Sequence, residues 1–420
     1  MTINYATPYN SAAMIRLTDD ELVDMLNDEM RASVTAVSVF VGIEAVIGIF
    51  GNLLVLYVFL FRYRHCNFRY FVLCLACLDF TSTVTTMPGE IVTQQFWYTY
   101  PLPTVCKVKS FFNMFTVSGE ALCLCVIAVD RHRKVCFPFG LQIRPRQALV
   151  LCFLIYASAF FIALPVAFLW GTHSDVVLYV GRNVTVTVCE KDMAYVNSNM
   201  PYNYTMSVEV ILGTNMLIML ILYVLISRKI LNRMIKKRKS PKEVSHIVMM
   251  TQTKTSKDNS DAGYASDAPR KVSKSASVST INEVGSTGRN AGNTSDNTHA
   301  GYVTDNETTC SDVKKASIKR VERTTSRHKN KTPGLARRKT YISLVLTVIF
   351  ILTTVLYLVL LTLITEGILE TLTNTQKAFY FFGFRLVFIN HVINPLVYGC
   401  MDPHFKQVLS EVKKCCRRSN

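Results

Sequence analysis

Seven long apolar runs dominate this chain of 420 residues and limit the folds open to it. Each run spans 20 residues or more, and they lie near 34–61, 70–92, 108–129, 147–170, 206–226, 341–365 and 378–400. A helix of that length crosses a bilayer core of about 30 Å. Only helices and closed barrels satisfy their backbone inside lipid, and continuous apolar runs favour helices over alternating strands. The sequence therefore predicts an all-α integral membrane protein, a seven-transmembrane helix bundle.

The charges between the runs predict how the chain is oriented in the membrane. The formal net charge is +17, and Arg and Lys cluster in segments 62–69 and 131–146, at both ends of 227–339 and in the C-terminal tail. Basic loops stay on the cytoplasmic side. We therefore expect a multi-pass protein of the plasma membrane, with its N-terminus outside and its C-terminus inside. The charge then reflects topology, and no nucleic-acid partner is expected.

The chain is predicted to have five parts. They are an extracellular N-terminus, helices 1–5, a third cytoplasmic loop, helices 6–7, and a membrane-surface helix with the tail, over residues 1–33, 34–230, 231–339, 340–400 and 401–420. The loop is rich in Ser, Thr, Asn, Lys and Gly and poor in large apolar residues, so it is predicted to be disordered. Its basic ends are explained equally well by anionic lipid headgroups and by contact with a protein partner.

Cysteines and sequons on the outer side predict two kinds of modification. Cys106, at the outer end of the third run, and Cys189, in the second outer loop, lie where a disulfide persists. Asn183 and Asn203 begin Asn-x-Thr sequons in the same loop and are predicted glycosylation sites. Similar sequons also occur in the inner loop, so the motif is weak support by itself.

The cytoplasmic tail carries a further signal. Cys415 and Cys416 follow a basic amphipathic stretch and are predicted lipidation sites that hold the tail at the membrane. The many hydroxyl groups of the third inner loop are candidate phosphorylation sites for kinases.

Four polar side chains from three runs are predicted to share one layer near the bilayer centre. At 1.5 Å per residue, Asp79 lies about 15 Å and Glu120 about 16 Å from the inner face, and Asn390 and Asn394 lie at comparable depth. Carboxylate and amide oxygens suit a hard cation such as Na⁺. A proton shared between Asp79 and Glu120 is a second explanation, because two close carboxylates in low dielectric do not both stay ionised. A hydrogen-bonded network without an ion is the third.

A charged trio, Asp130-Arg131-His132, ends the third run at the inner boundary. It serves either as a topology signal or as a contact for another protein. Arg131 held by Asp130 and then released would present five donors to a partner.

The last run contains Asn394-Pro395, and Tyr398 lies one turn below. Proline removes a helix hydrogen bond, so this turn is a candidate hinge. Tyr398 and Tyr223, on the fifth run, are both placed to swing toward Arg131.

Charges at the outer ends of the runs predict where a ligand binds. Glu90, Glu209 and Arg385 lie there, and Asn113 on the third run is a further candidate for the ligand pocket. Together with the acidic N-terminus they indicate an outward-facing pocket of negative character, although a single acid at such a boundary is often only solvated.

Short motifs in a fixed order resemble the rhodopsin-like (class A) G-protein-coupled receptor family. They cover about 34–231 and 335–416 and are Gly51-Asn52, Leu75-Ala76-Cys77-Leu78-Asp79, Cys106, Asp130-Arg131-His132, Cys189, Tyr223, Asn394-Pro395-Leu396-Val397-Tyr398 and Asp402-Pro403-His404-Phe405. Each motif is weak alone, but their order and spacing are specific. The resemblance implies a receptor and not an enzyme, with an extracellular ligand among the outer helix halves and a sixth span that moves outward.

The resemblance also implies partners. A heterotrimeric G protein would dock beside Arg131, kinases and arrestin would act on the loop and tail, and a sodium ion would lie among Asp79, Asn390, Asn394 and position 120.

Five positions depart from the family pattern. Glu120 stands where a small hydroxyl residue is usual, and His132 replaces a tyrosine. Asn215 replaces the proline of the fifth span, and Thr354 and Leu356 replace the tryptophan and proline of the sixth.

Two more positions narrow the ligand class. Receptors for amines carry an aspartate where this chain has Asn113, and opsins carry a lysine where it has Phe388. A neuropeptide is the best remaining guess. A sodium- or proton-coupled transporter is the alternative that Asp79 and Glu120 suggest, but transporters tend to have internal repeats and none is seen here.

Overall fold

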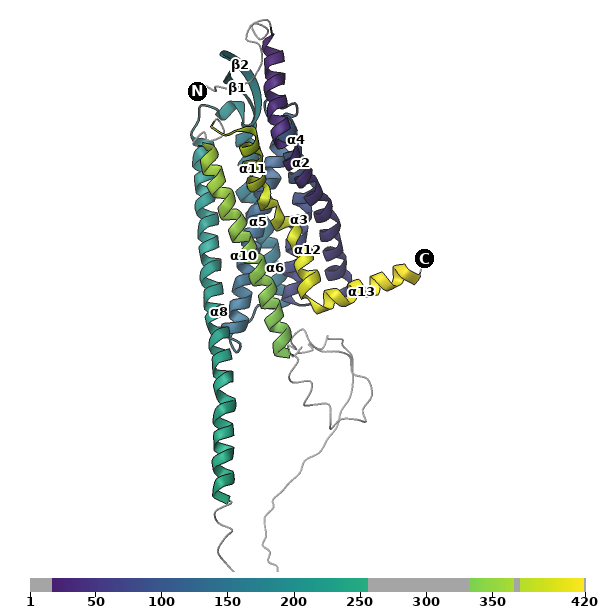
Figure 1. The fold of residues 1–420 in the computed structure, drawn as a ribbon, viewed down its shortest axis with the longest axis vertical. Helices are drawn as coiled ribbons and strands as arrows, with labels where there is room; N and C mark the ends of the chain where they lie inside the picture. The colour runs from purple at the N-terminus through teal and green to yellow at the C-terminus, as the bar shows by residue number, and fades with distance from the viewer. Residues whose placement is uncertain (1–16, 256–331, 366–370, 419–420) are drawn as a thin grey trace, which may run out of the picture. The chain divides into compact units, whose positions relative to one another are not determined.

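The structure, a computed structural model, describes residues 17–255, 332–365 and 371–418 (Figure 1). The chain divides into two units: the larger comprises residues 1–231 and 313–420, and the smaller is the segment between them. Of the smaller unit, only a continuation of the fifth helix is described. Within the described ranges, seven helices are long and apolar enough to cross a membrane, which confirms the predicted fold class.

The spans are built from one to three helical segments each. The first five are α2 (Asp19–Tyr57) with the π-helical turn η1 (Val58–Arg62), α3 (Asn67–Val84) with α4 (Thr86–Gln95), α5 (Pro103–Cys136), α6 (Pro145–Ala163) with α7 (Val166–Leu169), and α8 (Met200–Thr255). The last two are α10 (Thr332–Thr365), and α11 (Asn374–Arg385) with the 3-10 turn η4 (Leu386–Phe388) and α12 (Ile389–Met401). The short helix α13 (Pro403–Arg418) follows, as predicted.

The connection between the fourth and fifth spans folds into a β-hairpin. β1 (Trp170–Tyr179) pairs antiparallel with β2 (Arg182–Lys191), and the short helix η2 (Met193–Tyr195) follows. A disulfide joins Cys106 of α5 to Cys189 of β2, which confirms the predicted pair. We call this end of the larger unit the hairpin end and the opposite one the α13 end (Figure 1).

The first helix begins earlier than the apolar run. The Thr18 hydroxyl accepts from the Glu21 backbone N–H, and the Glu21 carboxylate accepts from the Thr18 N–H at 2.7 Å, so a capping box starts α2 well before residue 34. Leu22 of this added segment packs in one apolar cluster with Val184 of β2. Part of the predicted N-terminal segment is therefore helical, and its residues 1–16 lie outside the described part of the chain.

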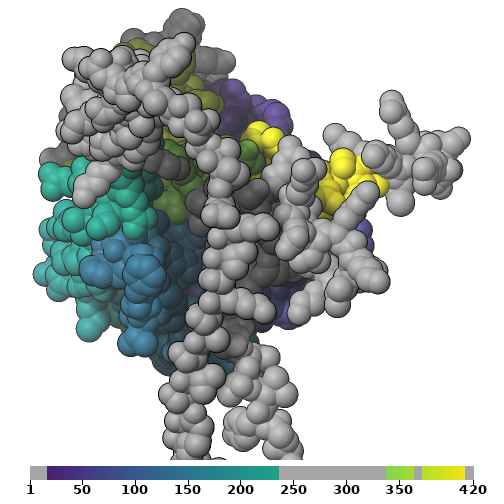
Figure 2. Space-filling view, turned by 90° about the horizontal axis from the view of Figure 1, so that it is seen from below, coloured from purple at the N-terminus to yellow at the C-terminus, as the bar shows by residue number. Residues whose placement is uncertain are grey.

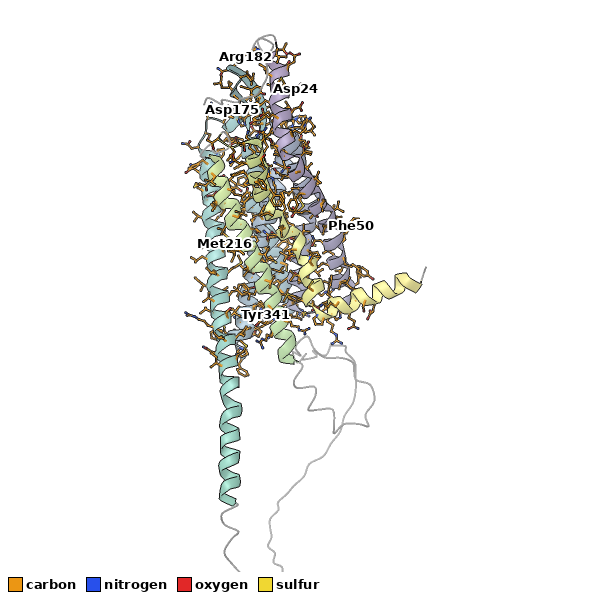
Figure 3. The ribbon with its side chains drawn as sticks, viewed as in Figure 1. Asp24, Phe50, Asp175, Arg182, Met216 and Tyr341 are labelled. Carbon is orange, nitrogen blue, oxygen red and sulfur yellow. A yellow bond between two sulfur atoms is a disulfide. The ribbon has the colours of Figure 1, made fainter. Side chains whose placement is uncertain are left out.

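Large apolar side chains cover the outer surface of the bundle. Phe50 is 71% exposed, and Phe153 and Leu352 are similarly open. Figure 3 shows Phe50 at the surface of α2. Such a surface would be an aggregation hazard in water, and it fits lipid surroundings instead.

A proline sets how the seventh span meets the first. Pro395 lacks an N–H, so the carbonyl of His391, four residues earlier, loses its helical partner. The side chain of Asn52 on α2 donates to that carbonyl at 2.8 Å. The helices approach closely here, because a Cβ on Gly51 would lie 2.8 Å from the Pro395 ring.

One prediction about the α13 end is wrong in part. The segment 231–339, predicted to be disordered, is helical at both borders, because α8 continues to Thr255 and α10 begins at Thr332. The stretch 256–331 between them lies outside the described residues. Figure 2 shows the teal atoms of α8 beside the blue atoms of the α5–α6 region at this end. Cys415 and Cys416 fall in α13, but their side chains lie outside the described part.

Candidate functional site

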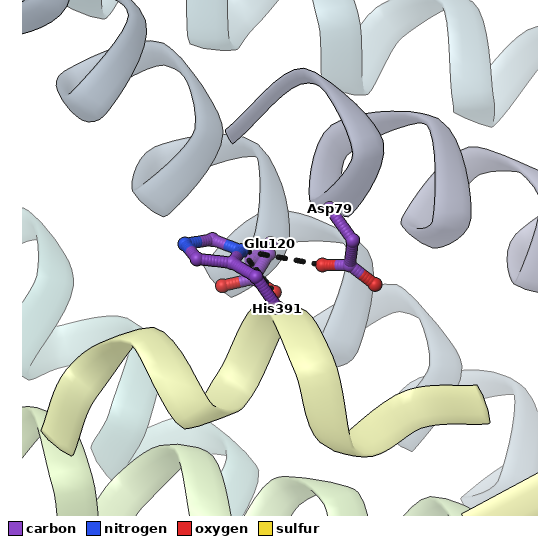
Figure 4. A group of neighbouring side chains, drawn as sticks. All are labelled: Asp79, Glu120 and His391. Atoms are coloured by element: carbon purple, nitrogen blue, oxygen red, sulfur yellow. Dashed lines mark hydrogen bonds and ion pairs between the residues drawn. The ribbon is translucent and has the colours of Figure 1, made fainter. Parts of the chain in front are cut away.

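Three ionisable side chains from three spans meet in the middle of the bundle (Figure 4). Asp79 comes from α3, Glu120 from α5 and His391 from α12. The His391 Nδ1 atom lies 3.3 Å from Asp79 Oδ1 and 3.2 Å from Glu120 Oε1. All three side chains are at least 97% buried. We call Asp79, Glu120 and His391 the mid-membrane trio.

The two asparagines predicted for this layer surround the trio. Asn394 donates to Asp79 Oδ2 at 2.5 Å. Asn390 exchanges hydrogen bonds with Thr353 of α10, at 2.8 and 3.1 Å. Glu120, Asn390 and Asn394 also line one small cavity of about 10 Å³. The structure therefore brings the four residues of the predicted ion site into one region.

His391 was missed in the sequence. It lies three residues before Asn394, one helical turn away and on the same face. An ionisable residue inside a predicted span is itself a signal of function. That signal pointed to Asp79 and Glu120 and applies equally to the histidine.

The sodium ion that the resemblance implies does not fit the trio well. Sodium is a hard cation that takes oxygen ligands, and the carboxylates of Asp79 and Glu120 meet that need. The atom that faces both carboxylates, however, is the Nδ1 of His391, an imidazole nitrogen. Imidazole suits softer transition-metal ions instead.

A second buried cluster lies nearer the hairpin end. The Glu90 carboxylate on α4 accepts a hydrogen bond from Lys109 Nζ of α5 at 3.0 Å and also forms an ion pair with Arg385 of α11. Lys109 donates in addition to the Thr93 hydroxyl at 2.8 Å. Two of the predicted ligand residues, Glu90 and Arg385, are thus brought together, and Lys109 is an addition from the tertiary structure.

The charge of this outer cluster (Glu90, Lys109, Arg385) is opposite to the predicted one. It holds two cations and one carboxylate, so its formal sum is positive. Arg385 is 5% exposed, and its Nε atom has no hydrogen-bond partner. Its guanidinium carbon lies 4.7 Å from the centre of the Phe384 ring, a cation–π contact.

The other two predicted ligand residues lie apart from these ion pairs. Asn113 is half-buried on α5, one turn below Lys109. Glu209 is half-buried on α8 and interacts electrostatically with Tyr357 of α10, as Arg385 and Glu90 do.

A third cluster lies toward the α13 end. Arg131 is buried and paired with Asp130 on the same helix. Asp130 also accepts from Lys134 at 3.1 Å and from Asn67 of α3 at 3.2 Å. Arg131 is therefore held within the bundle by a carboxylate that is itself fixed by two further donors.

Lys339 of α10 joins this region through aromatic rings. Its Nζ lies 5.1 Å from the Phe68 ring centre and 5.6 Å from that of Tyr63. The guanidinium of Arg131 lies 5.8 Å from the same Phe68 ring. We call Phe68, Arg131 and Lys339 the inner cation–aromatic cluster.

The remaining coupling candidates lie close by. Tyr223 of α8 receives a hydrogen bond from Thr347 of α10 at 3.4 Å, which joins the fifth and sixth spans. Tyr398 of α12 is 1% exposed and meets the Phe68 ring edge-on, with centroids 6.4 Å apart. His132 lies on the far side of α5, where its ring meets Phe137.

The comparison with protein families identifies the chain. Residues 51–398 match the model described as 7 transmembrane receptor (rhodopsin family). The chain belongs to this family. It is therefore a multi-pass membrane receptor and not an enzyme, and the alternative of a cation-coupled transporter is set aside.

Individual relatives of the receptor are distant. Trace amine-associated receptor 9 of Rattus norvegicus is 32% identical over 143 residues, 34% of this chain and 40% of the relative. Neuropeptide receptor 3 of Caenorhabditis elegans is 28% identical over 237 residues, 54% and 60% of the two chains. The receptor thus spans less than two thirds of the length of these curated relatives. Squid rhodopsin has the same fold, with a TM-score of 0.56 at 16% identity over 95% of this chain and 84% of that one.

The receptor departs from its family in the sixth span. Thr354 and Leu356 occupy the usual tryptophan and proline positions, and α10 is one helix across both. Thr354 is 3% exposed, and its hydroxyl has no hydrogen-bond partner. The sixth span therefore lacks the two residues that the family pattern has at these positions.

Proposed function

We propose that the receptor binds an extracellular peptide at the hairpin end and activates a heterotrimeric G protein at the α13 end. The basic segments 62–69 and 131–146 support this orientation through the positive-inside rule. The disulfide of Cys189 at the hairpin end agrees with an oxidising outer side. Asn183 on β2 and Asn203 at the start of α8 are exposed and remain predicted glycosylation sites.

The proposed ligand class rests on the ion pairs of the outer cluster. A cationic amine needs a free carboxylate, but Glu90 is already bonded to both Lys109 and Arg385. Asn113, at the position where amine receptors carry an acid, is uncharged. The buried Nε of Arg385 has no hydrogen-bond partner, and this favours a ligand that brings a carboxylate. Among the relatives, one is named a neuropeptide receptor and another a trace amine-associated receptor; the cluster favours the former.

A screen of expressed receptor tests the ligand class. Peptides with acidic groups and a panel of biogenic amines are applied to cells, and second messengers are read. Peptide agonists are expected, and Arg385→Gln should weaken acidic peptides more than their amidated forms. Activation by amines but by no peptide contradicts the proposal.

The inner end is proposed to contact the G protein through Arg131, presented when α10 moves and the pair with Asp130 opens. Agonist-driven nucleotide exchange should be lost in Arg131→Ala and retained in Arg133→Ala, a matched change two residues along the same helix. Equal exchange in the two variants contradicts the role of Arg131. Kinases and arrestin are proposed to act on the loop and tail.

A further inference from the structure

The mid-membrane trio has more negative charge than its own side chains balance. Two buried carboxylates, Asp79 and Glu120, face a single imidazole. A third acid, Glu44 of α2, is 6% exposed, interacts electrostatically with His391, and has an Oε2 atom without a hydrogen-bond partner. Uncompensated buried charge costs several kcal/mol, on the order of that needed to unfold a domain. Either protons on the carboxylates or a bound cation therefore balances the site.

The distances in the trio fit ligands around a metal ion as well as long hydrogen bonds. Charge-assisted N–H···O⁻ hydrogen bonds are short, about 2.7–2.9 Å. The two contacts of His391 Nδ1 are longer, at 3.3 and 3.2 Å. Two ligand atoms bound tetrahedrally to zinc at about 2.0–2.1 Å lie roughly 3.3 Å from each other. One ligand atom from each of the three residues lies within 4.8 Å of the others, so a single ion reaches all three.

The chemistry of the donors selects the ion. One imidazole and two carboxylates are ligands of zinc and related transition-metal dications. A dication neutralises both carboxylates, whereas sodium leaves one negative charge. Asn394 holds the outer oxygen of Asp79, as a supporting hydrogen bond does in known metal sites. The cavity beside Glu120, of about 10 Å³, is close to the room that one water needs.

We propose that Asp79, Glu120 and His391 form a zinc site that links the second, third and seventh spans. The ion stabilises the packing of α3, α5 and α12 against one another, because each helix supplies one ligand. Losing the ion would loosen the helix that carries Pro395. The site takes the place of the sodium ion implied by the family.

The metal content of the purified receptor tests this proposal without any agonist. The receptor is purified through a non-metal affinity tag, loaded with Zn²⁺, washed with metal-free buffer to remove loosely bound ions, and analysed by mass spectrometry. The expected result is about one Zn²⁺ per receptor, as for a fully occupied structural site. High sodium should not displace it, and a strong zinc chelator that removes it should lower the melting temperature.

Variants separate this site from other metal-binding side chains. His391→Ala and Glu120→Ser should each lose the retained zinc, whereas His404→Ala, a histidine on exposed α13, should keep it. If the wild-type receptor retains no zinc, the proposal is overturned and an imidazolium bridges the carboxylates instead. Zinc retained in His391→Ala overturns it as well. Wild-type zinc content decides the matter even if a variant does not fold, and it is independent of the proposed ligand and G protein.

Discussion

Lys339→Met should raise the basal activity of the receptor. Lys339 is 8% exposed, and its ammonium group joins α10 to Phe68 of α3 and to Tyr63. Methionine keeps the apolar stem of the side chain and removes only the charge. Because the usual switch residues of the sixth span are absent, we expect these contacts to hold α10 against the bundle in the resting state.

The size of the effect follows from the contact geometry. A cation within 6 Å of a ring centre gains about 0.5–1 kcal/mol when exposed and about 2 kcal/mol when desolvated. Lys339 is buried but shares Phe68 with Arg131, so we take about 1–2 kcal/mol for its two contacts together. If the contacts exist only in the resting state, their loss raises the population of the state in which α10 has moved outward about 5- to 30-fold.

The assay is nucleotide exchange by G protein in membranes without agonist, normalised to receptor at the surface. Arg337→Met is the matched control, because it removes an exposed cation of the same helix whose guanidinium lies 5.8 Å from the centre of the Tyr341 ring, also on α10. In a double-mutant cycle, Phe68→Leu should make most of the Lys339→Met effect disappear. An unchanged basal rate in Lys339→Met, or an equal rise in Arg337→Met, refutes the reasoning.

Three further predictions concern stability and are checked by thermal unfolding of purified receptor. Cys189→Ser, which removes the disulfide, should cost about 2–5 kcal/mol, and reductant should have no further effect on that variant. Gly51→Ala should cost about 1–3 kcal/mol because its methyl group meets a ring, whereas Gly213→Ala, with no atom within 4 Å, should be neutral or stabilising. Lys107 lowers the pKa of the Asp192 carboxyl through a 2.6 Å contact. The loss of stability in Lys107→Met should therefore be constant above about pH 5 and vanish below about pH 4, where acid protonates Asp192. A loss of stability that persists at lower pH contradicts this.

The spans were predictable because the bilayer imposes a simple length and composition. An apolar run of 20 residues has few other ways to satisfy its backbone. The loop 231–339 was predicted less well at its borders, because a helix that leaves the membrane continues as long as its residues favour it. The capping box at Thr18 shows the same effect at the start of α2.

Depth along a helix can be counted from the sequence, and it placed Asp79 and Glu120 in one layer. Which side chains of different spans face one another cannot be counted from the sequence, because it depends on how each helix is rotated and packed. Lys109 was missed for this reason, whereas His391 could have been found from its place one turn before Asn394 on the same span. Glu90 was predicted as part of an outward-facing pocket of negative character, and the tertiary structure encloses it between two cations.

The sequence by itself determined the seven spans, the disulfide pair and the presence of charge at three depths, because these follow from hydrophobicity, spacing and compartment. Only the tertiary structure decided which charges face one another. It set one imidazole between two carboxylates, a carboxylate between two cations, and Lys339 over Phe68. Most of these pairings join residues hundreds of positions apart, and all depend on helix rotations that no local pattern encodes.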